Sequence, residues 1–380
     1  MKARLLATCT ASGLVALAGC NAIFGLDPAC GWQTSNVDGC ALIAGQNLAD
    51  WTLSGPEAIV DTSLDAASWT IPADVVRLRT VASGDQKVAV LIVQDLNIPS
   101  TATLSVRGDR PLVILVKGIA TIDGIVSYDG VKRGPSTPAN VCPGQGVFGH
   151  ASLGTSEGSG GGGGSLGTSG ADGGAAGGLD GGMAGAVSMN PTAVPLLMGC
   201  DGGAGGFTAT AGVGGRGGGA LQISAATQIV ITGTVGAGGA GGPGGVSRSA
   251  GGGGGGGGGT ILIESPDVML APGAWNPDGP KLCANGGGGG AGADPGNSVA
   301  GPRGTDAVCL DLAAAGGMGV NSQPPGGNGA SRSTIATGGA STATISGGGG
   351  GGGGGLGTIR INGTIGGTAS LSTPLYTTDP

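Results

Sequence analysis

Large aromatic side chains are scarce in this chain, which holds three Phe, two Tyr and four Trp among 380 residues. Layered globular cores normally rely on such rings, so we do not expect an ordinary globular core. Charged residues make up only 10% of the chain, and the 23 acidic residues outnumber the 16 basic ones. An acidic chain with scattered charges lacks the basic surface that nucleic acids require, so we predict no nucleic-acid partner.

Histidine is represented by His150 alone, and no two cysteines have CxxC spacing. Zinc sites need clustered His or Cys ligands, and nucleophilic triads need a histidine or lysine base. We therefore predict no metal, no cofactor and no catalytic residue, and we interpret His150 as a solvated loop residue. Residues 290–294 approach the calcium-binding nonapeptide of β-helical toxins, but they miss its register and occur only once.

The N-terminus carries the most specific motif. Lys2 and Arg4 precede a short apolar run, and Ala18 and Gly19 stand directly before Cys20. This pattern resembles the lipobox of bacterial lipoproteins, with an ordinary secretory peptide as the alternative. The resemblance implies removal of residues 1–19, lipid on the Cys20 thiol, and anchoring to the cell envelope. Asn21 after the cysteine implies the outer membrane, by resemblance to the enteric sorting rule.

Six cysteines remain after the leader and the lipidated residue are set aside. An even number of thiols in an exported chain indicates disulfides. The simplest connectivity pairs neighbours within each region, although sequence alone leaves the other connectivities open. The candidate pairs are Cys30–Cys40, Cys142–Cys200 and Cys283–Cys309.

Three segments of twenty residues, 111–130, 220–239 and 260–279, align without a gap. They share aliphatic residues at the second, fourth and twelfth positions and a glycine at the fourteenth. The sixteenth is valine in the first two copies and tryptophan in the third, and a shortened copy begins at Thr358. The aligned residues are Leu112, Leu221 and Ile261; Ile114, Ile223 and Ile263; Ile122, Ile231 and Ala271; Gly124, Gly233 and Gly273; and Val126, Val235 and Trp275.

Alternation with a period of two indicates strands, and the fixed glycine indicates a corner between them. One such unit buries too little apolar surface to be stable alone, so we expect the units to stack. The predicted fold is an all-β parallel β-helix, or solenoid, with coils of about twenty residues interrupted by long glycine-rich loops. The alternative is a β-sandwich whose hairpins happen to share a length.

Glycine accounts for 92 residues, most of them between the repeats. Because glycine loses much entropy on ordering, we expect mobile loops there, with a packed bundle of polyglycine strands as the alternative. The predicted organisation is a leader (1–19), lipidated tether (20–30), N-terminal cap (31–60), first coils (61–130), insert (131–219), further coils (220–279), insert (280–357) and C-terminal strands (358–380).

The glycine run 347–355, followed by Thr358-Ile359-Arg360-Ile361, completes a resemblance to glycine-rich lipoproteins of bacterial envelopes. The leading hypothesis is a non-catalytic, lipid-anchored surface protein with a structural or adhesive role. Its partners would be the membrane, through the lipid, and an extracellular polysaccharide or surface partner. The alternative is a carbohydrate-active β-helix enzyme, with Asp129 and Asp278 as stacked carboxylates. Both aspartates also suit simple turns, and Trp275 suits packing better than sugar stacking.

Overall fold

The computed structural model describes residues 32, 34–63, 77–83, 86–132, 142–151, 157–188, 190–206, 211–246, 249–274, 276–294, 299–320, 322–342 and 347–378. It divides the chain into two units, Met1–Asn47 and Leu48–Pro380. The predicted leader, the tether and Cys20 lie outside the described residues. Within them, no helix is both long enough and apolar enough to cross a membrane.

The described part of the first unit contains one short helix, α2 (Gly39–Ile43). The Asp38 side chain caps it by accepting a 2.9 Å hydrogen bond from the Ala41 N–H. The residues of the predicted cap, 31–60, fall on both sides of the division between the units. Its later part forms strands β1 (Trp51–Thr52) and β2 (Glu57–Asp61), which pair with strands of the second unit.

The second unit is built on two parallel sheets, of eleven and six strands. Among the described strands, only β3 and β4 pair antiparallel, so the sheets are not those of a sandwich of hairpins. The remaining strands are β3 (Arg77–Ser83), β4 (Gln86–Val93), β5 (Leu96–Ile98), β6 (Thr103–Arg107), β7 (Leu112–Val116), β8 (Ile119–Ile122), β9 (Ile125–Ser127), β10 (Ala220–Ala225), β11 (Gln228–Ile231), β12 (Thr234–Gly236), β13 (Thr260–Leu270), β14 (Lys281–Cys283), β15 (Thr358–Gly367), β16 (Leu371–Thr373) and β17 (Thr377–Thr378).

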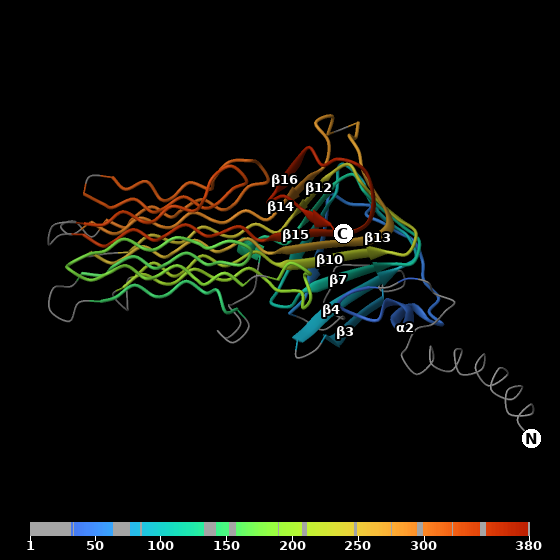
Figure 1. Ribbon diagram of the computed structural model, residues 1–380, viewed down its shortest axis with the longest axis horizontal. Coiled ribbons are helices and arrows are strands. Elements are labelled where there is room, and N and C mark those ends of the chain that lie inside the picture. Colours follow the sequence, from blue (N-terminus) through green and yellow to red (C-terminus); the bar gives the residue numbers. More distant parts are fainter. Residues whose placement is uncertain are drawn as a thin grey trace, which may run out of the picture. The chain divides into compact units, whose positions relative to one another are not determined.

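The parallel strands fall into three stacks (Figure 1). The first stack holds β4, β7, β10 and the first halves of β13 and β15. The second holds β1, β5, β8, β11 and the second halves of the same two long strands, which therefore join the first two stacks into one sheet. The third stack is the six-stranded sheet β2–β6–β9–β12–β14–β16.

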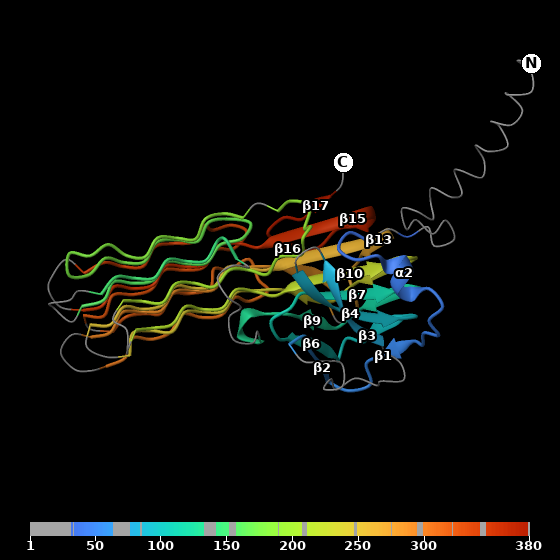
Figure 2. The same ribbon diagram turned by 90° about the horizontal axis from the view of Figure 1, so that it is seen from below.

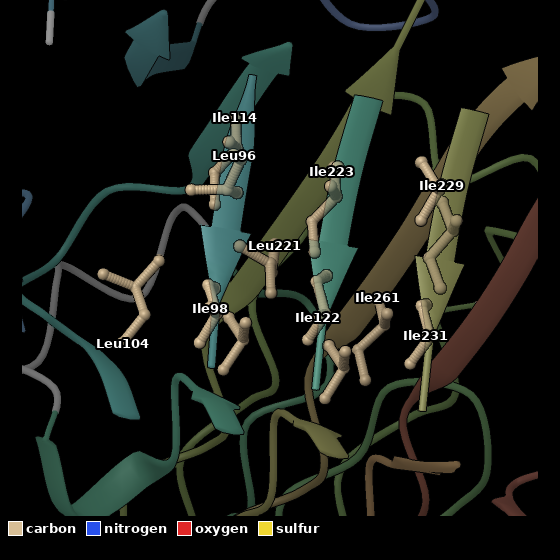
Figure 3. Close-up of a cluster of buried hydrophobic side chains, with 14 of the residues drawn as sticks. Leu96, Ile98, Leu104, Ile114, Ile122, Leu221, Ile223, Ile229, Ile231 and Ile261 are labelled. Carbon is tan, nitrogen blue, oxygen red and sulfur yellow. The ribbon is translucent and has the colours of Figure 1, made fainter. Parts of the chain in front are cut away.

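The aligned positions of the repeats are neighbours in the stacks. Leu221 pairs with Leu112 on one side and with Ile261 on the other, and Ile261 pairs in turn with Ile359. Alternate residues of all three stacks belong to one aliphatic core, and Figure 3 labels ten of the buried side chains that it draws. Burial of these aligned aliphatic side chains supplies the hydrophobic stabilisation that a single repeat lacks.

The third repeat departs from the gapless alignment. Ile231 pairs with Leu270, not with Ala271, and Val235 pairs with Leu282, so the predicted equivalence with Trp275 is wrong. Four positions separate Ile231 from Val235, whereas twelve separate Leu270 from Leu282. The third repeat therefore has an additional turn between its second and third strands. Trp275 itself lies outside the described residues.

The described parts of the glycine-rich inserts are joined by main-chain hydrogen bonds, which corrects the expectation of mobile loops for those parts. Their described parts form a sheaf of extended segments on one side of the stacks, visible in both views (Figures 1 and 2). We call the described parts of residues 142–219, 237–259 and 284–357 the glycine array. The alternative of packed polyglycine strands is therefore the one that the structure contains.

Residues 251–259 show how the glycine array is bonded. Their N–H groups donate in rotation to three segments, residues 200–206, 349–355 and 237–243, and every third N–H returns to the same segment. The carbonyls of residues 251–257 accept from three further segments, within residues 161–164, 212–218 and 287–290. A period of three is that of a polyproline II-type helix, whose backbone groups all point outward. Each central segment can therefore bond to six neighbours.

Only glycine permits this spacing. A Cβ atom added to Gly254 would lie 2.0 Å from the Gly162 carbonyl oxygen, and one added to Gly256 would lie 2.1 Å from that of Arg216. The same steric limit places glycine at the axis of the collagen triple helix. The glycine runs are therefore a packing requirement of the array.

Side-chain oxygens complete the bonding where a backbone acceptor is missing. In each case a carboxylate or amide oxygen accepts from a main-chain N–H of a neighbouring segment, which keeps that donor satisfied. The pairs are Asp172 with Ala184 (2.6 Å), Asp201 with Gly217 (2.8 Å), Asp306 with Gly241 (2.9 Å) and Asn328 with Gly316 (2.9 Å).

The aliphatic core predicts a large stability loss for truncation of Ile223, which is fully buried in the first stack. Ile223→Ala should lower the free energy of unfolding by about 2–5 kcal/mol, because it removes apolar contacts and leaves a cavity. Ile335→Ala is the control, since Ile335 is 85% exposed. Urea unfolding measures both variants, and equal effects of the two would contradict the core assignment.

The array predicts that a single methyl group is destabilising at Gly254. Gly254→Ala should lower the free energy of unfolding by at least about 2 kcal/mol, because the methyl would overlap a carbonyl of the next segment. Gly366→Ala in β15 should change it by less than about 0.5 kcal/mol, because a Cβ there meets nothing within 4 Å. Thermal unfolding compares the two, and an array of independent loops would tolerate both equally.

Candidate functional site

A cleft of about 340 Å³ lies on the outer face of the third stack. One side is formed by the short helical turn η2 (Gly130–Lys132) and the other by the chain leading to Cys309. Its volume is that of a small-ligand pocket. The lining residues are Thr103, Ile125, Val126, Ser127, Asp129, Lys132, Thr234, Gly236, Gly238, Cys283, Asn285, Ala307, Val308 and Cys309.

The floor of the cleft is open because Gly236 has no side chain. Gly236 pairs with Ser127 on one strand and with Cys283 on the next, so the row has a gap at its centre. A Cβ at Gly236 would meet only the Asp129 Oδ1 atom, at 3.6 Å. In contrast to the glycines of the array, this glycine leaves an accessible space.

One side of the cleft carries a continuous polar network. The Lys132 ammonium donates to the hydroxyls of Ser105 and Ser127, at 3.1 Å each. Ser105 donates in turn to Glu57, and Ser127 donates to the Oδ2 atom of Asp129. Each serine thus donates to a carboxylate and accepts from the ammonium. This hydrogen-bond network holds all five side chains in place.

The second oxygen of Asp129 is also bonded. Its Oδ1 atom accepts from the Gly238 N–H at 2.9 Å, which ties the carboxylate to the segment that follows β12. Ser105 is fully buried and Ser127 is 6% exposed, whereas Asp129 and Lys132 are half-buried at the cleft. The network is therefore rigid at its base and reachable by solvent at its charged ends.

A second row of side chains borders the cleft. Thr103, Ile125 and Thr234 are register neighbours on β6, β9 and β12 and face outward. Both threonines are half-buried, and neither hydroxyl has a hydrogen-bond partner in the part of the chain that the structure describes. Ile125 between them is 44% exposed. This row offers two free hydroxyls around an apolar surface.

The opposite wall is held by Asn285 and by a disulfide. The Asn285 side-chain amide donates to the carbonyls of Val308 (2.9 Å) and Leu310 (2.8 Å). Cys283 and Cys309 pair at a Cα–Cα distance of 5.2 Å, within the range of a disulfide. The wall is thus tied to β14 both covalently and by hydrogen bonds.

The predicted pair Asp129 and Asp278 is not brought together in one row. The residue beside Gly238 on the neighbouring segment is Asn285, whose carbonyl accepts from the Gly239 N–H at 2.9 Å. Asp278 is exposed in the additional turn of the third repeat. The stacked carboxylate pair was wrong because it relied on the gapless alignment.

The other predicted residues lie as follows. Cys142 and Cys200 pair at a Cα–Cα distance of 5.4 Å, consistent with the local pairing expected from the sequence. Cys40 is disulfide-bonded, and its expected partner Cys30 lies outside the described residues. The His150 side chain is exposed at the array, where its backbone pairs with Ser159.

Sequence reasoning missed the cleft itself. Lys132, Ser105 and Ser127 carry no motif, since the network joins three elements that are separate in the sequence. One signal was present: the seventeenth position is Ser127 in the first repeat but Gly236 in the second. Comparison with protein-family models, curated proteins and solved structures finds no match for the chain.

The disulfide wall predicts a coupled loss of stability. The double variant Cys283→Ala/Cys309→Ala should have a free energy of unfolding lower by about 2–4 kcal/mol than the wild type. The reason is that the two cysteines, 26 positions apart, no longer restrict the unfolded chain. Denaturant unfolding under non-reducing conditions provides the measurement. A dithiothreitol-treated wild type serves as the comparison, and an unchanged midpoint in the variant would contradict a structural disulfide.

Proposed function

We propose that this chain is a lipid-anchored, non-catalytic protein of the cell surface with a structural or adhesive role. The observation that supports this most is the glycine array, a sheaf of segments bonded laterally in several directions (Figure 2). Bonding to up to six neighbours makes such a body stiff. A stiff projection suits a spacer that holds contact residues away from its anchor.

We propose further that the three stacks form a parallel β-helix. In support, the repeats supply one strand to each stack in turn, as in β7, β8 and β9 and again in β10, β11 and β12. The in-register ladders of Leu112, Leu221 and Ile261 agree with a solenoid of stacked coils.

Exposed apolar side chains of the glycine array support the adhesive role. Phe148, Val246 and Val320 are 61%, 54% and 52% exposed. Apolar side chains at the surface supply area for contact with a partner. The partners in this proposal are an extracellular polysaccharide or another surface component.

The anchor rests on the N-terminal motif. Cys20 follows Ala18 and Gly19 as a lipobox requires, and Asn21 favours the outer membrane. Lipid on the Cys20 thiol, together with acylation of the new N-terminus, would hold the chain at the envelope. Mass spectrometry of the native N-terminus tests this directly, and we expect an acylated Cys20.

The anchoring step predicts a change of location. Cys20→Ser should move the chain from the membrane fraction to the soluble fraction, because no thiol remains for lipid attachment. Cys142→Ser, which alters a cysteine of the array, is the matched control and should leave the chain in the membrane fraction. An unchanged membrane fraction for Cys20→Ser would contradict the lipid anchor.

The adhesive role predicts weaker attachment when exposed apolar side chains of the array are made polar. Cells carrying Phe148→Ser/Val246→Ser/Val320→Ser should attach less to immobilised matrix from the same cells. Leu375→Ser is the matched control, because Leu375 is 62% exposed and lies outside the array. Equal attachment by both variants, at equal surface amounts, would contradict contact through the array.

A further inference from the structure

We propose that the cleft on the third stack is a binding site for one neutral sugar unit of a polysaccharide. This inference rests on the proposed function and names the ligand class that the surface protein would contact. It is carried by three observations: a hollow that no packing requirement explains, free hydroxyls on its rim, and balanced charges on its lining.

The hollow exists because residue 236 is a glycine. In the glycine array the chain uses glycine where a Cβ would overlap a neighbouring carbonyl, as at Gly254. At Gly236 a Cβ would sit in ordinary contact with a single carboxylate oxygen, so packing does not demand glycine there. A cavity that is kept open, polar on one side and apolar on the other, is the usual form of a small-ligand site.

The polar groups match a hydroxyl-rich ligand. Each sugar hydroxyl can donate one hydrogen bond and accept others. Asp129 supplies an acceptor, Lys132 a donor, and Thr103 and Thr234 supply hydroxyls that do both. Ile125, exposed between the two threonines, offers apolar surface to the C–H face of a sugar ring.

The charges favour a neutral sugar over an acidic one. Among the lining residues, Asp129 and Lys132 are the ionisable ones, and Ser127 links them through hydrogen bonds. The positive charge of the ammonium is thus already balanced by the Asp129 carboxylate. A uronate would have to displace this pairing and approach Asp129, which adds like-charge repulsion.

The same geometry favours binding without turnover. Glycoside hydrolysis generally uses two carboxyl groups that flank the scissile bond. Asp129 is the one carboxylate among the residues that line the cleft, and both of its oxygens accept hydrogen bonds from the protein. The site therefore holds a sugar but lacks the second carboxyl group.

The test is calorimetric titration of the full chain, extracted in detergent, with neutral oligosaccharides of glucose, galactose and mannose and with matched uronate oligosaccharides. We expect at least one neutral series to bind and the uronates to bind more weakly. Gly236→Val should weaken binding by about tenfold or more by filling the hollow. Gly366→Val is the matched control, a strand glycine with open space outside the cleft, and should bind like the wild type.

Thr234→Val provides a second variant that keeps the size of the side chain and removes one free hydroxyl, so it should also weaken binding. Unfolding temperatures verify that the variants are folded. Absence of binding to every neutral series, tighter binding of uronates, or full affinity in Gly236→Val would overturn the inference and leave the anchored, adhesive role standing. Hydrolysis of a bound oligosaccharide would instead overturn the non-catalytic role.

Discussion

Lateral hydrogen bonding between main chains is the constraint on which both parts of this molecule depend. In the stacks, neighbouring strands pair in register, and aliphatic side chains of the strands form one buried core. In the glycine array there is no enclosed space, and backbone bonds to backbone in several directions. Removing side chains allows more neighbours per segment, and this compensates for the small apolar surface that glycine buries.

The position of the inserts in the repeat explains why they meet. Each insert begins after a strand of the third stack and ends before a strand of the first stack, as residues 237–259 do between β12 and β13. Because the strands of each stack are neighbours, the inserts that connect them also lie side by side. The cleft forms at this junction, where Gly236 ends β12 and Asn285 continues from β14.

Periodicity was enough to predict the ladders but not the details of the third repeat. Leu112, Leu221 and Ile261 were aligned correctly because local alternation determines which residues face inward. Ala271 and Trp275 were misplaced because the third repeat is one residue shorter before Leu270 and eight residues longer before Leu282 than the second repeat. The array was underestimated because the partners of Gly254 are remote glycines such as Gly162, which composition alone cannot reveal. The cleft depends on the absence of a side chain at Gly236 and on contacts among elements that are distant in the sequence, so no sequence motif predicts it.

Amide hydrogen exchange, read at residues 251–259, tests the central claim most directly. If these glycines donate to three neighbouring segments, their exchange should be slowed by on the order of a thousandfold, comparable to that of β7 and β10. Exchange at the rate of an unstructured glycine peptide, alongside protected strands, would show that the inserts are independent loops. That result would contradict the laterally bonded array.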